Sequence, residues 1–168
     1  MTRVAIEDRA AFVARFGGVF EHSPWVAEAA FEAGLPVLPW TPEGLHAAMV
    51  LAMRAGSDEQ KRALIAAHPD LAGRLARAGR LTAESSKEQA SAGLDMLSDA
   101  ERQRFTALNE AYKAKFGLPF IMAVKGHTKD KILAAFERRL NNDSAAEFAT
   151  ALKEIEKIAL LRLKDLLP

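Results

Sequence analysis

The sequence of 168 residues contains no cysteine, which excludes disulfides, cysteine-ligated zinc, iron–sulfur clusters and thiol nucleophiles. It also lacks an excess of charge of one sign, because 23 basic and 22 acidic residues leave a formal net charge of +1. A protein that binds nucleic acid needs a net basic face, so this balance argues against a nucleic-acid partner.

Long apolar runs are missing as well. None approaches the ~18 residues that a membrane-spanning helix requires. The N-terminal MTRVAIEDRAAF has acidic residues where a signal peptide would have its apolar stretch. A cysteine-free sequence also suits a reducing compartment. We therefore expect a cytoplasmic protein with no membrane partner.

The alternation of polar and apolar residues that is typical of strands is nearly absent, whereas signals for helix starts are frequent. Thr41-Pro42 is typical of an N-cap followed by proline in the first turn. These signals predict an all-α fold: a single domain over residues 1–168, built as a bundle of about eight to nine helices. Capping boxes are predicted at Ser57…Gln60, Ser85…Glu88, Ser98…Glu101 and Ser144…Glu147. The expected helices cover residues 6–16, 24–33, 42–55, 58–67, 70–78, 86–95, 99–116, 129–140 and 145–166.

The segment from Leu118 to Val124 is apolar but short, and a proline follows its first leucine. Periodicity leaves open whether it is a buried extended connector or a short helix.

The motifs that usually bind metals, phosphates or dinucleotides are absent: there is no HExxH, GxSxG, P-loop or GxGxxG pattern. Four histidines are present, at positions 22, 46, 68 and 127, without metal-ligand spacing, so no metal site is predicted. His68 precedes Pro69, which biases it away from helical geometry. Two interpretations stay open: a histidine favoured by the dipole at a helix C-terminus, or a half-buried, rigidly aimed catalytic group.

Ser85, Glu88 and Gln89 lie in SSKEQASAGL. One interpretation is a capping box, with Ser86…Gln89 as its alternative one residue later. The other is a helix N-terminus whose free N–H groups bind an anionic ligand, with a carboxylate and an amide one turn further on.

Three arginines lie beside apolar residues of the expected helices. Arg138 and Arg139 precede Leu140, and we expect them on a solvated face with one intrahelical ion pair. Arg162 stands between two leucines and, if buried, needs a partner. That partner is either an internal carboxylate or a carboxylate or carbonyl of a ligand.

Five stretches occur together in this order: GGVFEHSPWVAEAA, HPDLAGRLA, LTAESSKEQASAGLD, LNEAYKAKFGLPFIMAVKG and EIEKIALLRLKDLL. In combination they resemble the OHCU decarboxylase family, from about Phe12 to Leu167. The family decarboxylates 2-oxo-4-hydroxy-4-carboxy-5-ureidoimidazoline to (S)-allantoin in urate breakdown. The resemblance therefore implies an all-α carboxy-lyase that needs no cofactor, binds a small anionic substrate and forms a homodimer.

The resemblance also implies roles for individual residues. His68 matches the central catalytic histidine, and Pro69 fixes it. Glu88 matches the glutamate of the SxxEQ motif, which lines the substrate site. The further substrate-binding positions that the resemblance implies are Ser85, Gln89, Pro119, Phe120, Ile121 and Arg162.

Two other classes of protein fit parts of the sequence. A non-catalytic helical interaction module explains the capping boxes and apolar stripes equally well, but not the spacing of His68, Ser85, Glu88 and Arg162. A metal-dependent hydrolase would use His22, His46 or His127, which the absence of ligand spacing disfavours.

Overall fold

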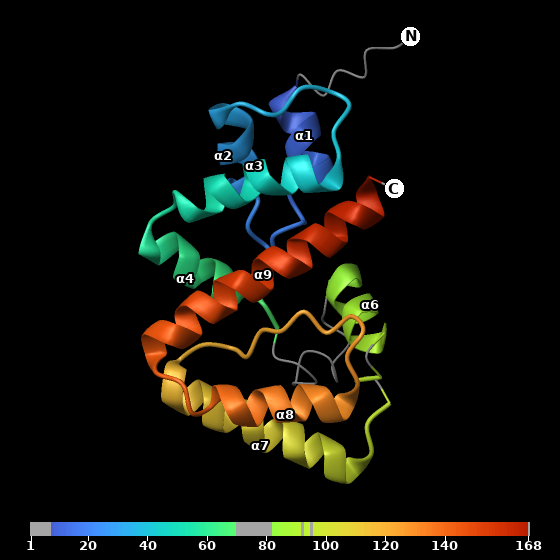
Figure 1. Cartoon of the computed structure of the whole chain (residues 1–168), viewed down its shortest axis with the longest axis vertical. Coiled ribbons are helices and arrows are strands. Elements are labelled where there is room, and N and C mark those ends of the chain that lie inside the picture. The colour runs from blue at the N-terminus through green and yellow to red at the C-terminus, as the bar shows by residue number, and fades with distance from the viewer. Residues whose placement is uncertain (1–7, 70–81, 92, 95, 168) are drawn as a thin grey trace. The chain divides into compact units, whose positions relative to one another are not determined.

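The computed structural model describes residues 8–69, 82–91, 93–94 and 96–167, and Figure 1 shows it as a ribbon. Over these residues the chain forms helices joined by turns and connectors, with no strand. This confirms the predicted all-α fold. The helices are α1 (Arg9–Phe16), α2 (Trp25–Ala33), α3 (Pro42–Arg54), α4 (Asp58–Ala67), α6 (Ala83–Ser91), α7 (Asp99–Phe116), α8 (Lys129–Arg139) and α9 (Ser144–Leu166).

The chain divides into two compact units. Unit 1 comprises Met1–Ala67 together with Glu156–Pro168, and unit 2 comprises His68–Ile155. The long helix α9 therefore contributes its first half to unit 2 and its second half to unit 1.

Unit 1 is built around aromatic and aliphatic side chains of its first three helices, and α2 packs against both α1 and α3. Phe12 and Phe16 are four residues apart, so they lie on one face of α1, and both are fully buried. Their ring centroids are 5.0 Å apart, and Trp40 meets Phe12 edge-on at 5.5 Å. Such aromatic contacts stabilise the core beyond the area that they bury.

Gly56, in the turn after α3, lies directly against the indole ring of Trp25. A methyl group on Gly56 would lie 2.8 Å from Cη2 of Trp25 and 3.0 Å from its Cζ3. The rigid ring would have to move, so we expect Gly56→Ala to lower the free energy of unfolding by about 1–3 kcal/mol.

Gly18→Ala is the matched control for this prediction, because a methyl group on Gly18 has no heavy atom within 4 Å among the described residues. The measurement is urea denaturation of both variants. Equal stabilities of Gly56→Ala and Gly18→Ala would contradict the predicted clash.

Unit 2 contains α6, α7 and α8, and α7 and α8 lie side by side (Figure 1). Ser98 and Glu101 form the predicted capping box at the start of α7. The backbone N–H of Ser98 donates to Oε1 of Glu101 (3.0 Å), and Lys129 lies 2.9 Å from the same carboxylate. These two contacts, the backbone hydrogen bond most of all, lower the pKa of Glu101 to about 2. The carboxylate therefore stays charged at the helix N-terminus, where negative charge is stabilising.

The starts of α1, α6 and α9 differ from the predictions. α1 begins at Arg9, after its N-cap Asp8, whereas the predicted helix began at residue 6. α6 begins at Ala83, so Ser85 is its third residue and not its N-cap, and the predicted span 86–95 is wrong. α9 is capped by Asp143, whose Oδ1 accepts from the backbone N–H of Ala146 (2.7 Å), so the predicted Ser144…Glu147 box is also wrong. The capping box at Ser57…Gln60 is confirmed. The expected helix over residues 70–78 lies outside the described residues.

Candidate active site

His68 is the first residue after α4, and only 7% of it is exposed. Leu64 and Ile65, one turn earlier, are fully buried, so the end of α4 lies in the protein interior. Pro69 follows and keeps the backbone of His68 out of the helical conformation. The structure thus places a buried histidine at a rigid junction, which is the setting that the catalytic interpretation requires.

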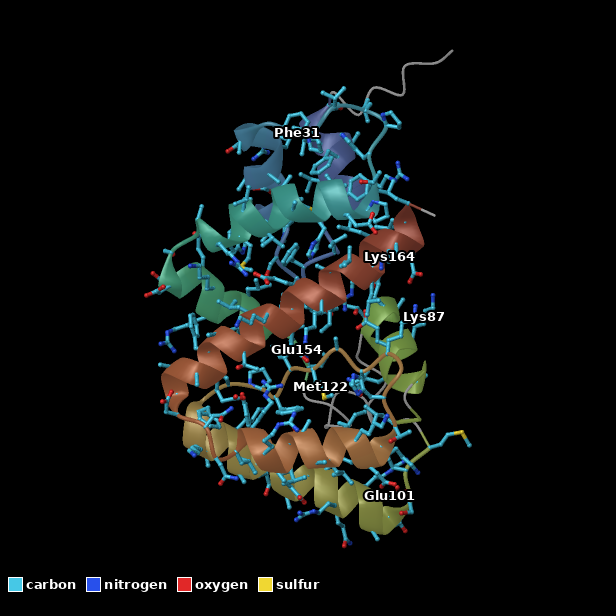
Figure 2. All side chains as sticks on the ribbon, in the orientation of Figure 1. Phe31, Lys87, Glu101, Met122, Glu154 and Lys164 are labelled. Atoms are coloured by element: carbon cyan, nitrogen blue, oxygen red, sulfur yellow. The ribbon has the colours of Figure 1, made fainter. Side chains whose placement is uncertain are left out.

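α6 supplies the second group of predicted residues. Gln89 is 5% exposed and Glu88 is half-buried, whereas their neighbour Lys87 is exposed (Figure 2). The carbonyl oxygen of Gln89 accepts a hydrogen bond from the backbone N–H of Leu94 (3.0 Å), which lies beyond the end of α6. Position 85 lies one turn before Glu88 in the same helix, while the side chain of Ser85 lies outside the described part of the chain.

The segment from Leu118 to Val124 is an extended connector between α7 and α8, which decides between the two predicted alternatives. Figure 2 labels Met122 within it. Pro119, Phe120 and Ile121 are all buried. The ring of Phe120 stacks on Phe136 with centroids 3.7 Å apart and meets Tyr112 edge-on at 5.3 Å. Phe120 therefore joins the connector to the aromatic core of unit 2.

A buried ion pair that the sequence interpretation missed holds this connector. Nε of Arg139 donates to Oε1 of Glu147 (2.8 Å), and Nη1 donates to the carbonyl oxygen of Ile121 (2.6 Å). Arg139 is 5% exposed and Glu147 is fully buried, so the predicted solvated position of Arg139 is wrong. Arg138 is exposed as expected. Spacing could have shown this difference, because Arg139 continues the buried stripe of α8 at positions 132, 135 and 136.

Glu147 is held in turn by two further donors. The hydroxyl of Tyr112 donates to Oε1 (2.6 Å), and Nδ2 of Asn142 donates to Oε2 (2.9 Å). Burial raises the pKa of the Tyr112 hydroxyl, and its hydrogen bond to Glu147 raises that pKa further. Tyr112 therefore remains a proton donor over the physiological pH range, and Glu147 keeps both carboxylate oxygens bonded.

Arg162 belongs to unit 1, whereas His68, α6 and the connector belong to unit 2. It is 5% exposed, and its Nη2 donates to Oε2 of Glu21 (2.7 Å). Its Nη1 donates to the carbonyl oxygens of Gly18 (3.2 Å) and Val19 (3.5 Å). An internal carboxylate, one of the two predicted alternatives, is thus a partner of this buried guanidinium.

The other histidines lie elsewhere. Nε2 of His46 donates to the carbonyl oxygen of Glu156 (2.7 Å) within unit 1. His22 and His127 are exposed. Among the described residues, no three His, Asp or Glu side chains are grouped so as to hold a metal ion. None of the helices in that part of the chain is long and apolar enough to cross a membrane.

Removing Glu21 should be far more costly than removing an exposed partner of an arginine. Glu21→Ala removes the buried carboxylate that Nη2 of Arg162 contacts, and we expect a loss of about 3–5 kcal/mol in the free energy of unfolding. Glu32→Ala, which removes an exposed partner of Arg9, is the control and should cost less than about 1 kcal/mol. Chemical denaturation measures both losses, and similar values for the two variants would contradict a stabilising role of the buried pair.

Comparison with known proteins assigns this chain to a family. The OHCU decarboxylase family model matches residues 7–164. The chain is 44% identical to a 2-oxo-4-hydroxy-4-carboxy-5-ureidoimidazoline decarboxylase of Haloferax volcanii, over 94% of this chain and 90% of the relative. It is 41% identical to the enzyme of that name from Halalkalicoccus jeotgali, over 99% and 93% of the two chains.

The fold is similar to a solved structure of (S)-allantoin synthase. The TM-score is 0.72 at 34% identity, over 95% of this chain and 51% of the other, so the chain spans about half the length of that structure. Both relatives are named as decarboxylases, which defines the class of enzyme to which this all-α chain is similar. The chain belongs to the OHCU decarboxylase family.

Proposed function

We propose that this chain is a carboxy-lyase that converts 2-oxo-4-hydroxy-4-carboxy-5-ureidoimidazoline to (S)-allantoin in urate degradation. The observation that carries the proposal is the match of the family model to residues 7–164, which is nearly the whole chain. Three relatives that bear this activity in their names align over at least 93% of this chain and over at least 87% of their own length. We therefore also propose that residues 1–168 act as one OHCU decarboxylase domain.

The chemistry of the substrate explains what the protein has to supply. The carboxylate sits on a carbon that also bears a hydroxyl, next to a C=N bond of the ring. When the C–C bond to CO2 breaks, its electron pair moves into that C=N system, so the substrate is its own electron sink. The protein must hold the ring and ureido group, shield the carboxylate from water, and move a proton to one face of the product.

His68 is the proton-transfer group in this proposal. An imidazole gains and loses a proton near neutral pH, which suits exchange with the substrate hydroxyl and the product carbon. Burial of His68 and the adjacent Pro69 supports the role, because a fixed ring delivers its proton to one face only. Glu88, half-buried on α6, accepts hydrogen bonds from ureido or ring N–H groups or selects the tautomer of His68.

The remaining residues bind and shield the substrate. Ser85 and Gln89 on α6 donate to its carbonyl oxygens. Pro119, Phe120 and Ile121 form the apolar wall beside the carboxylate, which their burial supports. Arg162 donates hydrogen bonds from its planar guanidinium to a carbonyl or to negative charge of the substrate. Its contact with Glu21 supports a fixed orientation of the guanidinium.

The test of the activity generates the unstable substrate in place from urate by oxidation and hydrolysis. With the wild-type protein present, we expect fast decay of the substrate and circular dichroism of optically active allantoin. His68→Asn keeps the shape of the side chain but removes proton transfer, so we expect kcat at least ~100-fold lower. His127→Asn, at an exposed position of unit 2, should retain wild-type turnover.

Two outcomes of this assay decide between the candidate functions. No acceleration by the wild-type protein would favour the non-catalytic interaction module over the lyase. Acceleration by the wild type together with near-wild-type turnover of His68→Asn would keep the activity and remove the role of His68.

We further propose that the protein is a cytoplasmic homodimer. The resemblance to the family supports the dimer, and the cysteine-free sequence supports a reducing compartment. Sedimentation velocity at micromolar concentration should give a single species of twice the mass of the chain. A species with the mass of one chain over that concentration range would overturn the dimer.

A further inference from the structure

Arg139 contacts two adjacent residues of the connector to which the proposed function assigns the apolar wall. Its Nη1 donates to the backbone carbonyl of Ile121 at 2.6 Å. Its Cζ lies 4.3 Å from the ring centroid of Phe120, a cation–π distance. One guanidinium therefore contacts both the backbone and a side chain of the connector between α7 and α8.

The guanidinium itself cannot turn freely. Glu147 accepts its Nε, and that carboxylate is held by Tyr112 on α7 and by Asn142 in the turn before α9. Phe120 is enclosed on its other side by the stack on Phe136. These contacts fix the position of the guanidinium of Arg139. Because its Nη1 donates to the carbonyl oxygen of Ile121, they also fix the position of that carbonyl.

This arrangement is costly if its only purpose is stability. Nη2 of Arg139 is buried and has no hydrogen-bond partner among the residues that the structure describes. A buried donor without a partner is destabilising, because it loses its hydrogen bonds to water. Buried ion pairs are often no more stabilising than apolar residues of similar volume. Stability alone therefore does not explain a buried arginine at position 139. A need to hold the connector in one position does, because the guanidinium contacts both Phe120 and Ile121.

We propose that Arg139 is a positioning residue for the decarboxylase reaction: it fixes the Pro119–Ile121 wall in place against the substrate. The proposal rests on the proposed function, because that function assigns the wall to the substrate. Arg139 acts through Phe120 and Ile121 and does not itself touch the substrate. Nothing in the sequence resemblance singled it out.

Arg139→Lys is the test. Lysine keeps the positive charge, but a single ammonium on a flexible stem cannot form the same fork with Glu147 and Ile121 while lying flat over Phe120. A displaced wall should lower kcat/KM by about 10- to 100-fold, since misplacement by 1 Å has effects of that size. The kinetics are measured at a temperature where circular dichroism shows the variant to be fully folded.

Arg138→Lys is the matched control, because it makes the same substitution at the neighbouring, exposed arginine of α8. Both contacts of Arg139 with the connector remain, so we expect the Tm of wild type and kcat/KM within twofold of wild type. Peptide-level hydrogen exchange over residues 118–124 gives a readout that needs no activity: faster exchange in Arg139→Lys, and wild-type exchange in Arg138→Lys.

The outcomes separate the two proposals. Unchanged kcat/KM and unchanged exchange in Arg139→Lys, with only a lower Tm, would overturn the positioning role. An inactive wild type with faster exchange in Arg139→Lys would overturn the decarboxylase assignment, and with it the role of Arg139 in that reaction, but would keep Arg139 as the residue that fixes the connector. If Arg139→Lys does not fold, Arg139→Gln with Glu147→Gln removes both charges and keeps an amide donor toward Ile121. That pair should exceed Arg139→Ala with Glu147→Ala in kcat/KM, and equal values would overturn the proposal.

Discussion

The ion pair between Arg139 and Glu147 is the contact on which unit 2 depends. It joins α8 to α9 directly, and through Tyr112, Asn142 and Ile121 it also joins α7, the turn before α9 and the connector. Since Glu147 is fully buried, removal of either partner leaves a charge in a medium that solvates it poorly. The aromatic core of this unit is packed against the same guanidinium through Phe120.

Unit 1 uses the same physical device. Arg162 and Glu21 form a buried pair, with Nη2 and Oε2 2.7 Å apart. Nη1 of Arg162 donates to the carbonyl oxygens of Gly18 and Val19, just after α1. α9 contributes one residue to each pair, Glu147 near its start and Arg162 near its end. The same helix contributes buried apolar side chains to both units, Ala151 and Ile155 to unit 2 and Ile158, Ala159 and Leu163 to unit 1.

Short sequence motifs correctly predicted those helix starts that depend on interactions between neighbouring residues. The capping boxes at Ser57 and Ser98 and the helix that begins at Pro42 follow from side chains within three residues of the helix start. The burial of His68 and Ile121 agrees with one of the two alternatives that the residues left open at each place, a half-buried histidine and a buried connector, whereas no local pattern predicted the burial of Gln89. Arg139 was assigned to the surface because an adjacent arginine pair is typical of a solvated face. Its partners lie 8 and 18 residues away on other elements, and no local pattern encodes such contacts.

The central claim is that His68, the α6 residues and the 119–121 wall bind the reacting molecule. Amide-resolved NMR of the wild-type protein titrated with (S)-allantoin tests it most directly, because the product shares the ring and ureido group of the substrate. We expect saturable shifts of the amides of His68, Glu88, Gln89 and Ile121, with the amide of Lys153, an exposed residue of α9, unchanged. Saturable shifts confined to other parts of the chain, or none at millimolar (S)-allantoin, would contradict it.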